Sequence, residues 1–155
     1  MNAYRLKPVN FPWPPLLYAI AVVAALLLGN LFRLSLPARN LQMAAGVALL
    51  ILAVLLDLWA LKTLFSARTT VMPNRSASRL VTDGPYRFTR NPVYLGYTAS
   101  TIAFGLILGN PWFLIAAFAA AVVTSQIVIR REEMHLLARF GIEYERYCRR
   151  TRRWL

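Results

Sequence analysis

The stretch LQMAAGVALLILAVLLDLWALKTLF, residues 41–65, decides the fold of this chain. Its only charged side chains are those of Asp57 and Lys62. At about 1.5 Å per helical residue it would reach roughly 37 Å, which is longer than the hydrocarbon core of a bilayer is thick. The stretch therefore predicts a tilted transmembrane helix rather than an element of a soluble domain.

Three further apolar runs accompany it, at residues 16–32, 93–108 and 112–129. The last two are separated only by Gly109-Asn110-Pro111, and small residues recur along both, so we expect a tight antiparallel hairpin. The pattern predicts an all-α, integral membrane protein of one domain. Its four transmembrane helices would cover 16–32, 41–65, 93–108 and 112–129, with a loop over 66–91 and a helical C-terminal segment over 130–155.

The charge is strongly positive and unevenly distributed. The chain has 18 Lys and Arg against 6 Asp and Glu, a net charge of +12. In a soluble protein this would suggest a nucleic-acid partner, but beside long apolar runs it is typical of cytoplasmic helix ends that meet anionic lipids. The two loops on the other side would carry only Arg33 and Arg39. We therefore expect membrane lipids and no nucleic acid as partners, with both termini and the 66–91 loop in the cytoplasm.

A polar, aromatic motif, GPYRFTRNPVYLG, fills residues 84–96 just before the third run. Asn91 is a preferred helix N-cap and Pro92 a preferred first helical residue, so a simple helix start explains both. It does not explain the tyrosines and arginines around them. A helix N-terminus beside Arg90 suits a carboxylate, and the faces of Tyr86 and Tyr94 suit a purine or a ribose.

A second polar stretch, RREEMHLLARFGIEYERY, follows the fourth run at residues 130–147. Its apolar residues recur at helical spacing, and Gly141 fits a helix C-cap, after which a short helix would present Tyr144 and Tyr147 together. An amphipathic helix lying on the bilayer would explain the arginines and leucines. It would not explain the adjacent Glu132 and Glu133 against an anionic surface.

Taken together, these residues resemble the integral-membrane methyltransferases, the group that contains isoprenylcysteine carboxyl methyltransferases and phospholipid N-methyltransferases. The likeness covers about residues 66–155. It rests on Gly-Pro-Tyr-Arg, Arg-Asn-Pro-x-Tyr-x-Gly, Glu-Glu-x-x-Leu-x-x-x-Phe-Gly-x-x-Tyr-x-x-Tyr and an arginine-rich end. Thr69-Thr70-Val71-x-Pro73 and Leu80-Val81 also match bacterial members, which implies the bacterial inner membrane.

The resemblance implies S-adenosylmethionine as methyl donor, in a cytoplasm-facing pocket roofed by the C-terminal segment. The residues implied to bind it are Tyr86, Arg90, Asn91, Pro92, Tyr94, Gly96, Glu132, Tyr144 and Tyr147. We hypothesise that Glu133, with Arg130, orients the acceptor or deprotonates an amine. Many carboxyl methyltransferases of the group have His where this chain has Asn91, which cannot become cationic.

The acceptor implied is lipophilic or lipid-anchored and would enter between the helices. A prenylated cysteine carboxylate, a phosphatidylethanolamine amine and a small lipophilic nucleophile all stay open. We expect no metal site, because the single Cys148 and the single His135 provide no ligand cluster.

Two alternative functions that involve no catalysis compete with the methyltransferase. A small four-span exporter would use Asp57, an ionisable residue inside an apolar run. A membrane adaptor would bind lipid or a partner through its basic tail. Truncation after Ile129 would leave the exporter active and inactivate the enzyme, and an adaptor would show no saturable binding of S-adenosylmethionine.

Overall fold

The computed structural model describes residues 13–67 and 79–155 of the chain. Four helices run side by side in an elongated bundle: α1 (Trp13–Leu31), α2 (Arg39–Ser66), α3 (Pro92–Leu108) and α4 (Trp112–Val123). Over the described ranges the only β-type pairing is one isolated bridge, so the all-α prediction is confirmed there. The Thr69–Pro73 lead and the first twelve residues lie outside the described part.

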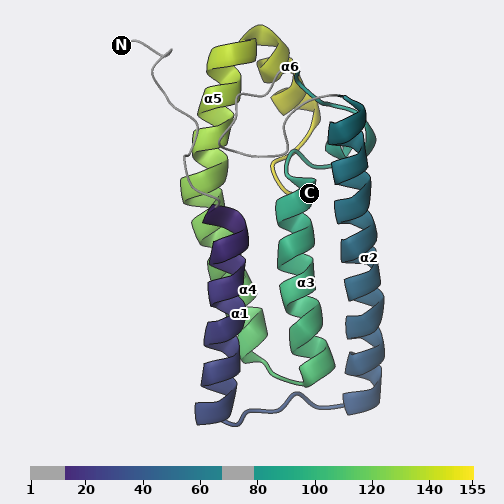
Figure 1. Ribbon diagram of the computed structural model, residues 1–155, viewed down its shortest axis with the longest axis vertical. Coiled ribbons are helices and arrows are strands. Elements are labelled where there is room, and N and C mark those ends of the chain that lie inside the picture. The colour runs from purple at the N-terminus through teal and green to yellow at the C-terminus, as the bar shows by residue number, and fades with distance from the viewer. Residues whose placement is uncertain (1–12, 68–78) are drawn as a thin grey trace.

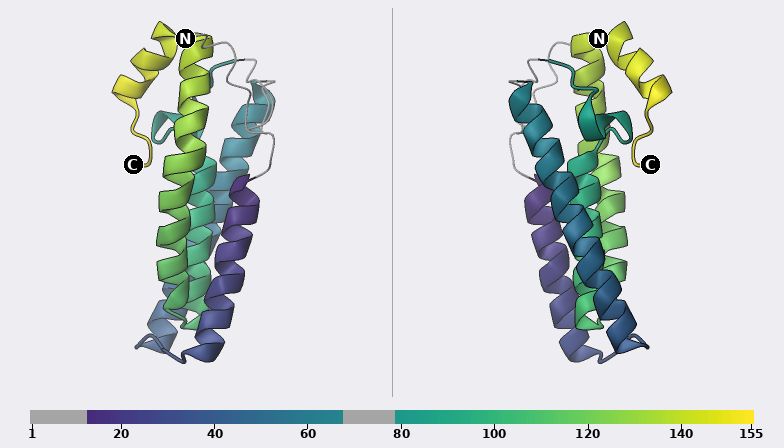
Figure 2. Two further views of the ribbon diagram at one scale, coloured as in Figure 1. Left: turned by 90° about the vertical axis from the view of Figure 1, so that its left-hand side faces the viewer. Right: turned by 90° about the vertical axis from the view of Figure 1, so that its right-hand side faces the viewer.

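The fourth helix does not end where the apolar run ends. α4 passes through a π-helical segment, Thr124–Ile129, into α5 (Arg130–Phe140), so the predicted boundary at residue 129 falls inside a continuous helix. No stop signal occurs before Gly141, whose φ is +51°. There the chain turns, and α6 (Ile142–Arg150) folds back beside the tip of the long helix (Figure 2). The expected C-cap at Gly141 is therefore confirmed.

Three helical stretches are long and apolar enough to cross a membrane: Pro14–Leu31, Arg39–Ser66 and Trp112–Phe140. α3 is equally apolar in character but has 17 residues. Large side chains on the outside of the bundle are widely exposed, such as Phe118 at 72% and Ile20 at 58%. Such a surface is stable against lipid tails rather than water. Three membrane-length helices are thus established by length and composition, while the fourth span stays a prediction.

Small residues allow the helices to approach closely. A Cβ on Gly46 of α2 would lie 2.9 Å from the Ala103 carbonyl oxygen of α3, and a Cβ on Gly105 would lie 2.7 Å from Cβ of Phe113 in α4. Close backbone approach of this kind is typical of helix packing in membranes. The predicted α3–α4 hairpin is confirmed, with Gly109 at φ +67° and the side-chain Nδ2 of Asn110 donating to the Ala25 carbonyl of α1 at 3.1 Å.

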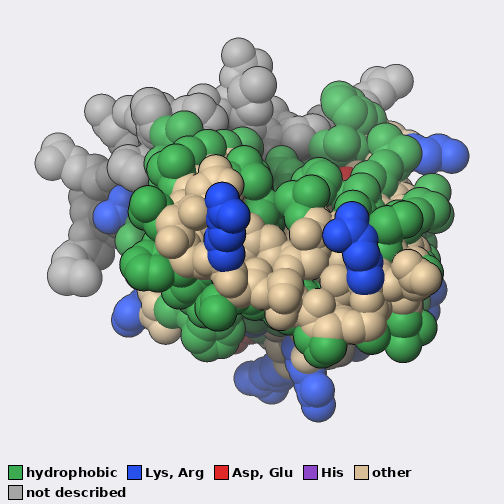
Figure 3. Space-filling model, turned by 90° about the horizontal axis from the view of Figure 1, so that it is seen from below, with side chains coloured by type: hydrophobic (Ala, Val, Ile, Leu, Met, Phe, Trp, Pro, Cys, Tyr) green, Lys and Arg blue, Asp and Glu red, His purple; other side chains and the backbone are tan. Residues whose placement is uncertain are grey.

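The two ends of the bundle differ in chemistry. The end that carries the short connections around residues 32–38 and 109–111 presents mostly hydrophobic and uncharged groups, with few basic side chains (Figure 3). Residues 84–91, the part of the 84–96 motif that precedes α3 and is called the 84–91 motif below, gather with α5, α6 and the C-terminus at the opposite end (Figure 1). The fold therefore brings both polar stretches of the sequence to one end of the molecule.

Candidate functional site

The C-terminal tail is bound along the 84–91 motif. Gly84–Arg87 forms a 3-10 turn, after which Thr89 and Arg152 form a parallel β-bridge. The Arg90 amide donates to the Arg152 carbonyl at 3.0 Å. Farther along, the Tyr147 hydroxyl donates to the Tyr86 carbonyl at 2.7 Å. The structure thus brings together two stretches about sixty residues apart in sequence.

Asn91 takes part in this attachment rather than in helix capping. It stands at the N-cap position of α3, directly before Pro92, but makes no capping hydrogen bond with its side chain. Instead its Nδ2 donates to the Arg153 carbonyl at 2.8 Å. A carbonyl needs only a neutral donor, so the Asn91 side chain performs this role without the positive charge that a histidine could carry. The helix start is as the sequence predicts, and the partner of Asn91 is not.

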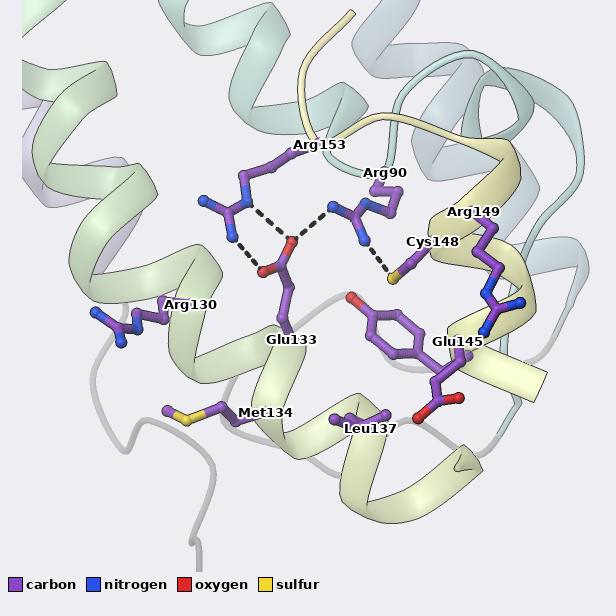
Figure 4. A pocket seen from close by; sticks show the side chains of 10 residues that line it. Arg90, Arg130, Glu133, Met134, Leu137, Glu145, Cys148, Arg149 and Arg153 are labelled. Carbon is purple, nitrogen blue, oxygen red and sulfur yellow. Dashed lines mark hydrogen bonds and ion pairs between the residues drawn. The ribbon is translucent and has the colours of Figure 1, made fainter. Parts of the chain in front are cut away.

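Glu133 is the centre of the charged cluster at this end. Its carboxylate accepts from Nε of Arg153 at 3.0 Å and from Nη2 at 2.5 Å, and Arg90 Nη2 lies 3.1 Å from Oε1 (Figure 4). Hydrogen bonding to Glu133 raises the pKa of Arg153 above its ordinary value. Arg90 also donates through Nη1 to the Cys148 sulfur. One carboxylate of α5 therefore joins the end of the 84–91 motif to the C-terminal tail.

A cavity of about 590 Å³ opens beside this cluster (Figure 4). Its volume lies within the range typical of small-molecule sites. The lining residues are Arg90, Arg130, Glu133, Met134, Leu137, Tyr144, Glu145, Cys148, Arg149 and Arg153. Arg90 Nε is buried and has no hydrogen-bond partner in the part of the chain that is described. The cavity is therefore bordered by four arginines, one of which, Arg90, keeps a buried donor unused.

Two tyrosines of α6 lie together, as the sequence predicts. The rings of Tyr144 and Tyr147 are 6.2 Å apart and tilted by 60°, and both residues are buried. Burial raises the pKa of each phenol well above its ordinary value, so both hydroxyls stay protonated near neutral pH. Tyr144 lines the cavity, whereas Tyr147 uses its hydroxyl to attach α6 to the 84–91 motif.

A second polar layer lies closer to the bundle. The Tyr94 hydroxyl of α3 donates to Glu132 Oε2 at 3.1 Å. Burial raises the pKa of Tyr86, and the negative charges of Glu132 and Asp57 raise it further, so both carboxylates act on this one phenol. Asp57 itself lies against Gly96, where a Cβ would come within 1.9 Å of Oδ1.

Only some of the site residues predicted from the sequence line the cavity. Four of them border the cavity: Arg90, Arg130, Glu133 and Tyr144. The others lie outside its lining: Tyr86, Asn91, Pro92, Tyr94, Gly96, Glu132 and Tyr147. Sequence reasoning did not single out Arg153, Cys148, Met134, Leu137, Glu145 or Arg149. The arginine-rich end was noted as a feature, but only the fold shows which of its arginines reaches Glu133.

The donor set of the cavity fits a zwitterionic nucleoside ligand. Arginines can bind a carboxylate in a forked geometry, and four of them border the cavity. Glu145 can accept from an ammonium group or from hydroxyls. Tyr144, Met134 and Leu137 provide aromatic and apolar contacts for a flat base. The residues present therefore fit S-adenosylmethionine in charge and in contact chemistry.

Comparison with known proteins gives one family match and two relatives that each cover part of the chain. The phospholipid methyltransferase family matches the chain over residues 41–143. An uncharacterised protein of Haemophilus influenzae is 38% identical over 63 residues, 41% of this chain and 100% of that protein. The Delta(14)-sterol reductase LBR of Gallus gallus is 31% identical over 85 residues, 52% of this chain but only 13% of that protein.

Proposed function

Because this chain belongs to the phospholipid methyltransferase family, we propose that it transfers a methyl group from S-adenosylmethionine to a lipophilic acceptor at the membrane. The observation that carries the proposal is the cavity beside Glu133. It is bordered by Arg90 at the end of the 84–91 motif, by α5 and by the tail residue Arg153. Both sequence stretches that resemble membrane methyltransferases thus contribute to one cavity.

When bound, S-adenosylmethionine supplies an electrophilic methyl group on a positively charged sulfur. The protein has to bind the donor, align the acceptor and exclude water. In the proposed arrangement Arg90 and Arg149 bind the carboxylate of the donor and Glu145 its amino group. Tyr144, which stays protonated, contacts the nucleoside. The tail closes the cavity by its backbone hydrogen bonds to residues 89–91.

The ion pairs of Glu133 favour neither of the two roles expected for it, orientation of the acceptor or proton abstraction, but a third one. Its two oxygens already accept from Arg153 and face Arg90, so a proton could be taken only after these ion pairs open. We therefore assign Glu133 to positioning the two arginines, and Arg130, which is exposed at the cavity edge, to orienting the acceptor headgroup.

The proposed setting is the bacterial inner membrane, crossed four times, with the termini and the cavity on the cytoplasmic side. α3, with 17 mostly apolar residues, would be a span in addition to the three longer ones, because it packs between them. The acceptor would reach the cavity sideways from the cytoplasmic leaflet. A prenylated cysteine carboxylate, a phospholipid amine and a small lipophilic nucleophile are the candidate classes.

The test combines binding and transfer with the full-length protein in detergent. S-adenosylhomocysteine should bind saturably in a calorimetric titration, and radiolabelled methyl groups should enter membrane lipids only in the presence of the protein. Glu133→Gln should lose most transfer, since the two arginines would no longer be held. No binding of S-adenosylhomocysteine would refute the methyltransferase and favour an exporter or a lipid-binding adaptor.

A second candidate function follows from the relationship to the sterol reductase. Reductases of this kind need a hydride donor, commonly a nicotinamide dinucleotide, whose phosphates would suit a cavity bordered by four arginines. The same calorimetric experiment with reduced nicotinamide dinucleotides separates the two. Tight dinucleotide binding without binding of S-adenosylhomocysteine would assign the cavity to a reductase.

A further inference from the structure

A second cavity, of about 520 Å³, lies on the other side of α6 from the first one beside Glu133. Along α6, residues 144, 145, 148 and 149 line the first cavity, whereas residues 143, 146, 147 and 150 line the second. The members of each set recur at helical spacing, so the two sets occupy opposite faces of the helix. α6 therefore separates two cavities, and the proposed methyl transfer uses only the first.

Three arginines border the second cavity without a partner. Arg146 and Arg150 lie one turn apart on α6, and Arg87 is the last residue of the 3-10 turn. In the described part of the chain, no ion pair and no side-chain hydrogen bond involves any of these three guanidinium groups. Exposed arginines are commonly only solvated. Three unpaired guanidinium groups from two segments around one cavity, however, match the oxygens of a phosphate group.

Two carboxylates, those of Asp83 and Glu143, also border the second cavity. Both residues are exposed, and neither forms an ion pair within the ranges that the structure describes. The charged side chains of the cavity therefore do not neutralise one another. Phosphate oxygens suit the arginines, and hydroxyl donors suit the carboxylates. A glycerol phosphate group offers both.

The turn that carries Arg87 lies against a membrane-length helix. A Cβ on Gly84 would come within 2.7 Å of Thr63 Oγ1 in α2. The ring of Phe88, the residue after Arg87, lies 6.3 Å from the ring of Trp59 in α2, and both aromatic side chains are exposed. Exposed aromatic residues near the end of a membrane helix are typical of the headgroup region. One wall of the second cavity therefore suits the depth at which lipid phosphates lie.

The same turn is attached to α6. The Tyr147 hydroxyl donates to the Tyr86 carbonyl at 2.7 Å, and the Thr151 hydroxyl donates to the Arg87 carbonyl at 3.3 Å. The like charges of Arg87 and of the two α6 arginines oppose this attachment. A phosphate between them replaces repulsion by attraction and so holds α6 in place. Because α6 also carries Tyr144 of the first cavity, occupation of either cavity should favour occupation of the other.

We propose that the second cavity binds a glycerol phosphate group, either of an anionic lipid or free in solution, and thereby strengthens ligand binding in the first cavity. The existence of this site does not depend on the proposed methyl transfer. Only its effect on the binding of S-adenosylmethionine rests on the proposed function. An anionic membrane would then activate the protein without supplying its acceptor.

The first test measures binding without a methyl donor. Full-length protein in neutral detergent is titrated with short-chain phosphatidylglycerol, glycerol 3-phosphate and short-chain phosphatidylcholine. A salt concentration of about 0.15 M screens unspecific attraction between exposed charges. We expect saturable binding of phosphatidylglycerol and much weaker binding of phosphatidylcholine, whose ammonium group offsets its phosphate.

The glycerol 3-phosphate titration identifies the source of the ligand. Binding as tight as that of phosphatidylglycerol would assign the site to a free ligand, and much weaker binding would assign it to a lipid. If neither compound bound saturably, or if phosphatidylcholine bound as tightly as phosphatidylglycerol, the proposal would be overturned.

Neighbouring arginines of α6 provide matched variants. Arg150 borders the second cavity and Arg149 the first, and both are exposed, so replacing either with Gln removes the same charge without disturbing the bundle. Arg150→Gln should weaken binding of phosphatidylglycerol by up to about fivefold, the contribution of one exposed ion pair, and the double variant with Arg146→Gln by about tenfold. Arg149→Gln should leave this binding unchanged.

Two results with these variants would overturn the proposal. Equal losses in Arg149→Gln and Arg150→Gln would mean that the overall charge of α6 attracts the lipid. A loss in Arg149→Gln alone would place the lipid in the first cavity.

The second test measures the connection between the two cavities. Phosphatidylglycerol should tighten binding of S-adenosylhomocysteine by about fivefold, and S-adenosylhomocysteine should tighten binding of phosphatidylglycerol by the same factor. The variant that combines Arg146→Gln with Arg150→Gln should lose this gain and keep its affinity for S-adenosylhomocysteine in detergent alone. Phosphatidylglycerol that binds in the second cavity and leaves the affinity for S-adenosylhomocysteine unchanged would refute the connection.

Together the tests separate this inference from the proposed function. Absence of S-adenosylhomocysteine binding would refute the methyltransferase, while the phosphatidylglycerol titrations would still decide whether the second cavity is a glycerol phosphate site. Saturable binding of S-adenosylhomocysteine without binding of either glycerol phosphate would refute the second site and leave the methyltransferase intact.

Discussion

Arg153 donates two hydrogen bonds to Glu133, from Nε at 3.0 Å and from Nη2 at 2.5 Å, and so ties the end of the chain to α5. Arg90 reaches the same carboxylate from the start of α3. Two guanidinium groups that share one carboxylate leave the cluster with an excess positive charge. An anionic group of a ligand would neutralise this excess charge. We therefore expect ligand binding to depend on the ion pairs of Glu133.

Replacement of Arg153 tests whether the ion pairs of Glu133 support ligand binding. We expect Arg153→Ala to weaken binding of S-adenosylhomocysteine by about 10- to 100-fold, because it removes a cation from the cavity lining and two charged hydrogen bonds that hold Glu133, and such bonds contribute about 1.5–3 kcal/mol each. Arg153→Lys should recover only part of the affinity, since an ammonium cannot reproduce the two-pronged contact. Calorimetry in detergent measures both values.

The neighbouring Arg152 provides the matched control. Its side chain is exposed, and only its backbone takes part in the bridge to Thr89 and Arg90, so Arg152→Ala removes the same charge from the tail without touching Glu133. Equal losses of affinity in the two alanine variants would show that overall tail charge, and not the Glu133 contact, controls binding.

Asn91 offers a test of tail attachment. Asn91→Ala removes the donor to the Arg153 carbonyl, and a typical net hydrogen bond of about 1 kcal/mol corresponds to roughly a fivefold shift between bound and released tail. Amide hydrogen exchange in residues 151–155 should therefore speed up by about that factor. Exchange in α2 should not change. An unaltered tail would mean that the β-bridge at Thr89 is sufficient to hold it.

The helical bundle could be predicted from the sequence because short, contiguous stretches determine its helices and turns. The largely apolar run at residues 41–65 and the Gly109-Asn110-Pro111 turn each dictate their structure without reference to the rest of the chain. The length of the fourth helix, in contrast, does not follow from the apolar run. Apolarity ends near residue 129, but helix formation depends on backbone signals, and the first of those is Gly141.

The site was harder to predict because its contacts are non-local. The pattern gave Glu133, Arg90 and Tyr144 as candidates, and all three border the cavity. It could not say that Nδ2 of Asn91 would donate to the tail, because that partner lies 62 residues away in the sequence. Nor could it select Arg153 among eight arginines after residue 129, because selection depends on where the returning tail meets α5.

Gly141 is expected to control the placement of α6. Its backbone, at φ +51° and ψ −122°, lies in a region that only glycine adopts readily, although a Cβ would meet nothing within 4 Å. Gly141→Ala should therefore cost about 1–3 kcal/mol through backbone strain alone. Because α6 carries Tyr144, we also expect weaker binding of S-adenosylhomocysteine. Gly109→Ala, strained at the far end of the bundle, should lower stability without changing that affinity.

Alkaline pH should destabilise the protein through its buried phenols. Burial raises the pKa of Tyr147 above its ordinary value of 10.0, and the same holds for Tyr86 and Tyr144. Above about pH 10 the unfolded chain releases phenolic protons that the folded chain retains, so the stability present below that pH is progressively lost. The thermal midpoint, followed by circular dichroism in detergent, should stay level between about pH 7 and 9 and then fall.

A single substitution separates this effect from general charge repulsion. Tyr147→Phe should lower the midpoint near neutral pH, because its hydroxyl no longer donates to the Tyr86 carbonyl. Above pH 10 the variant should decline less steeply than the unmodified protein, because one fewer phenol changes its protonation on unfolding. Parallel declines for the two proteins would mean that Tyr147 ionises as readily in the folded chain as in the unfolded one. Its burial at the junction of α6 and the 84–91 motif would then be incorrect.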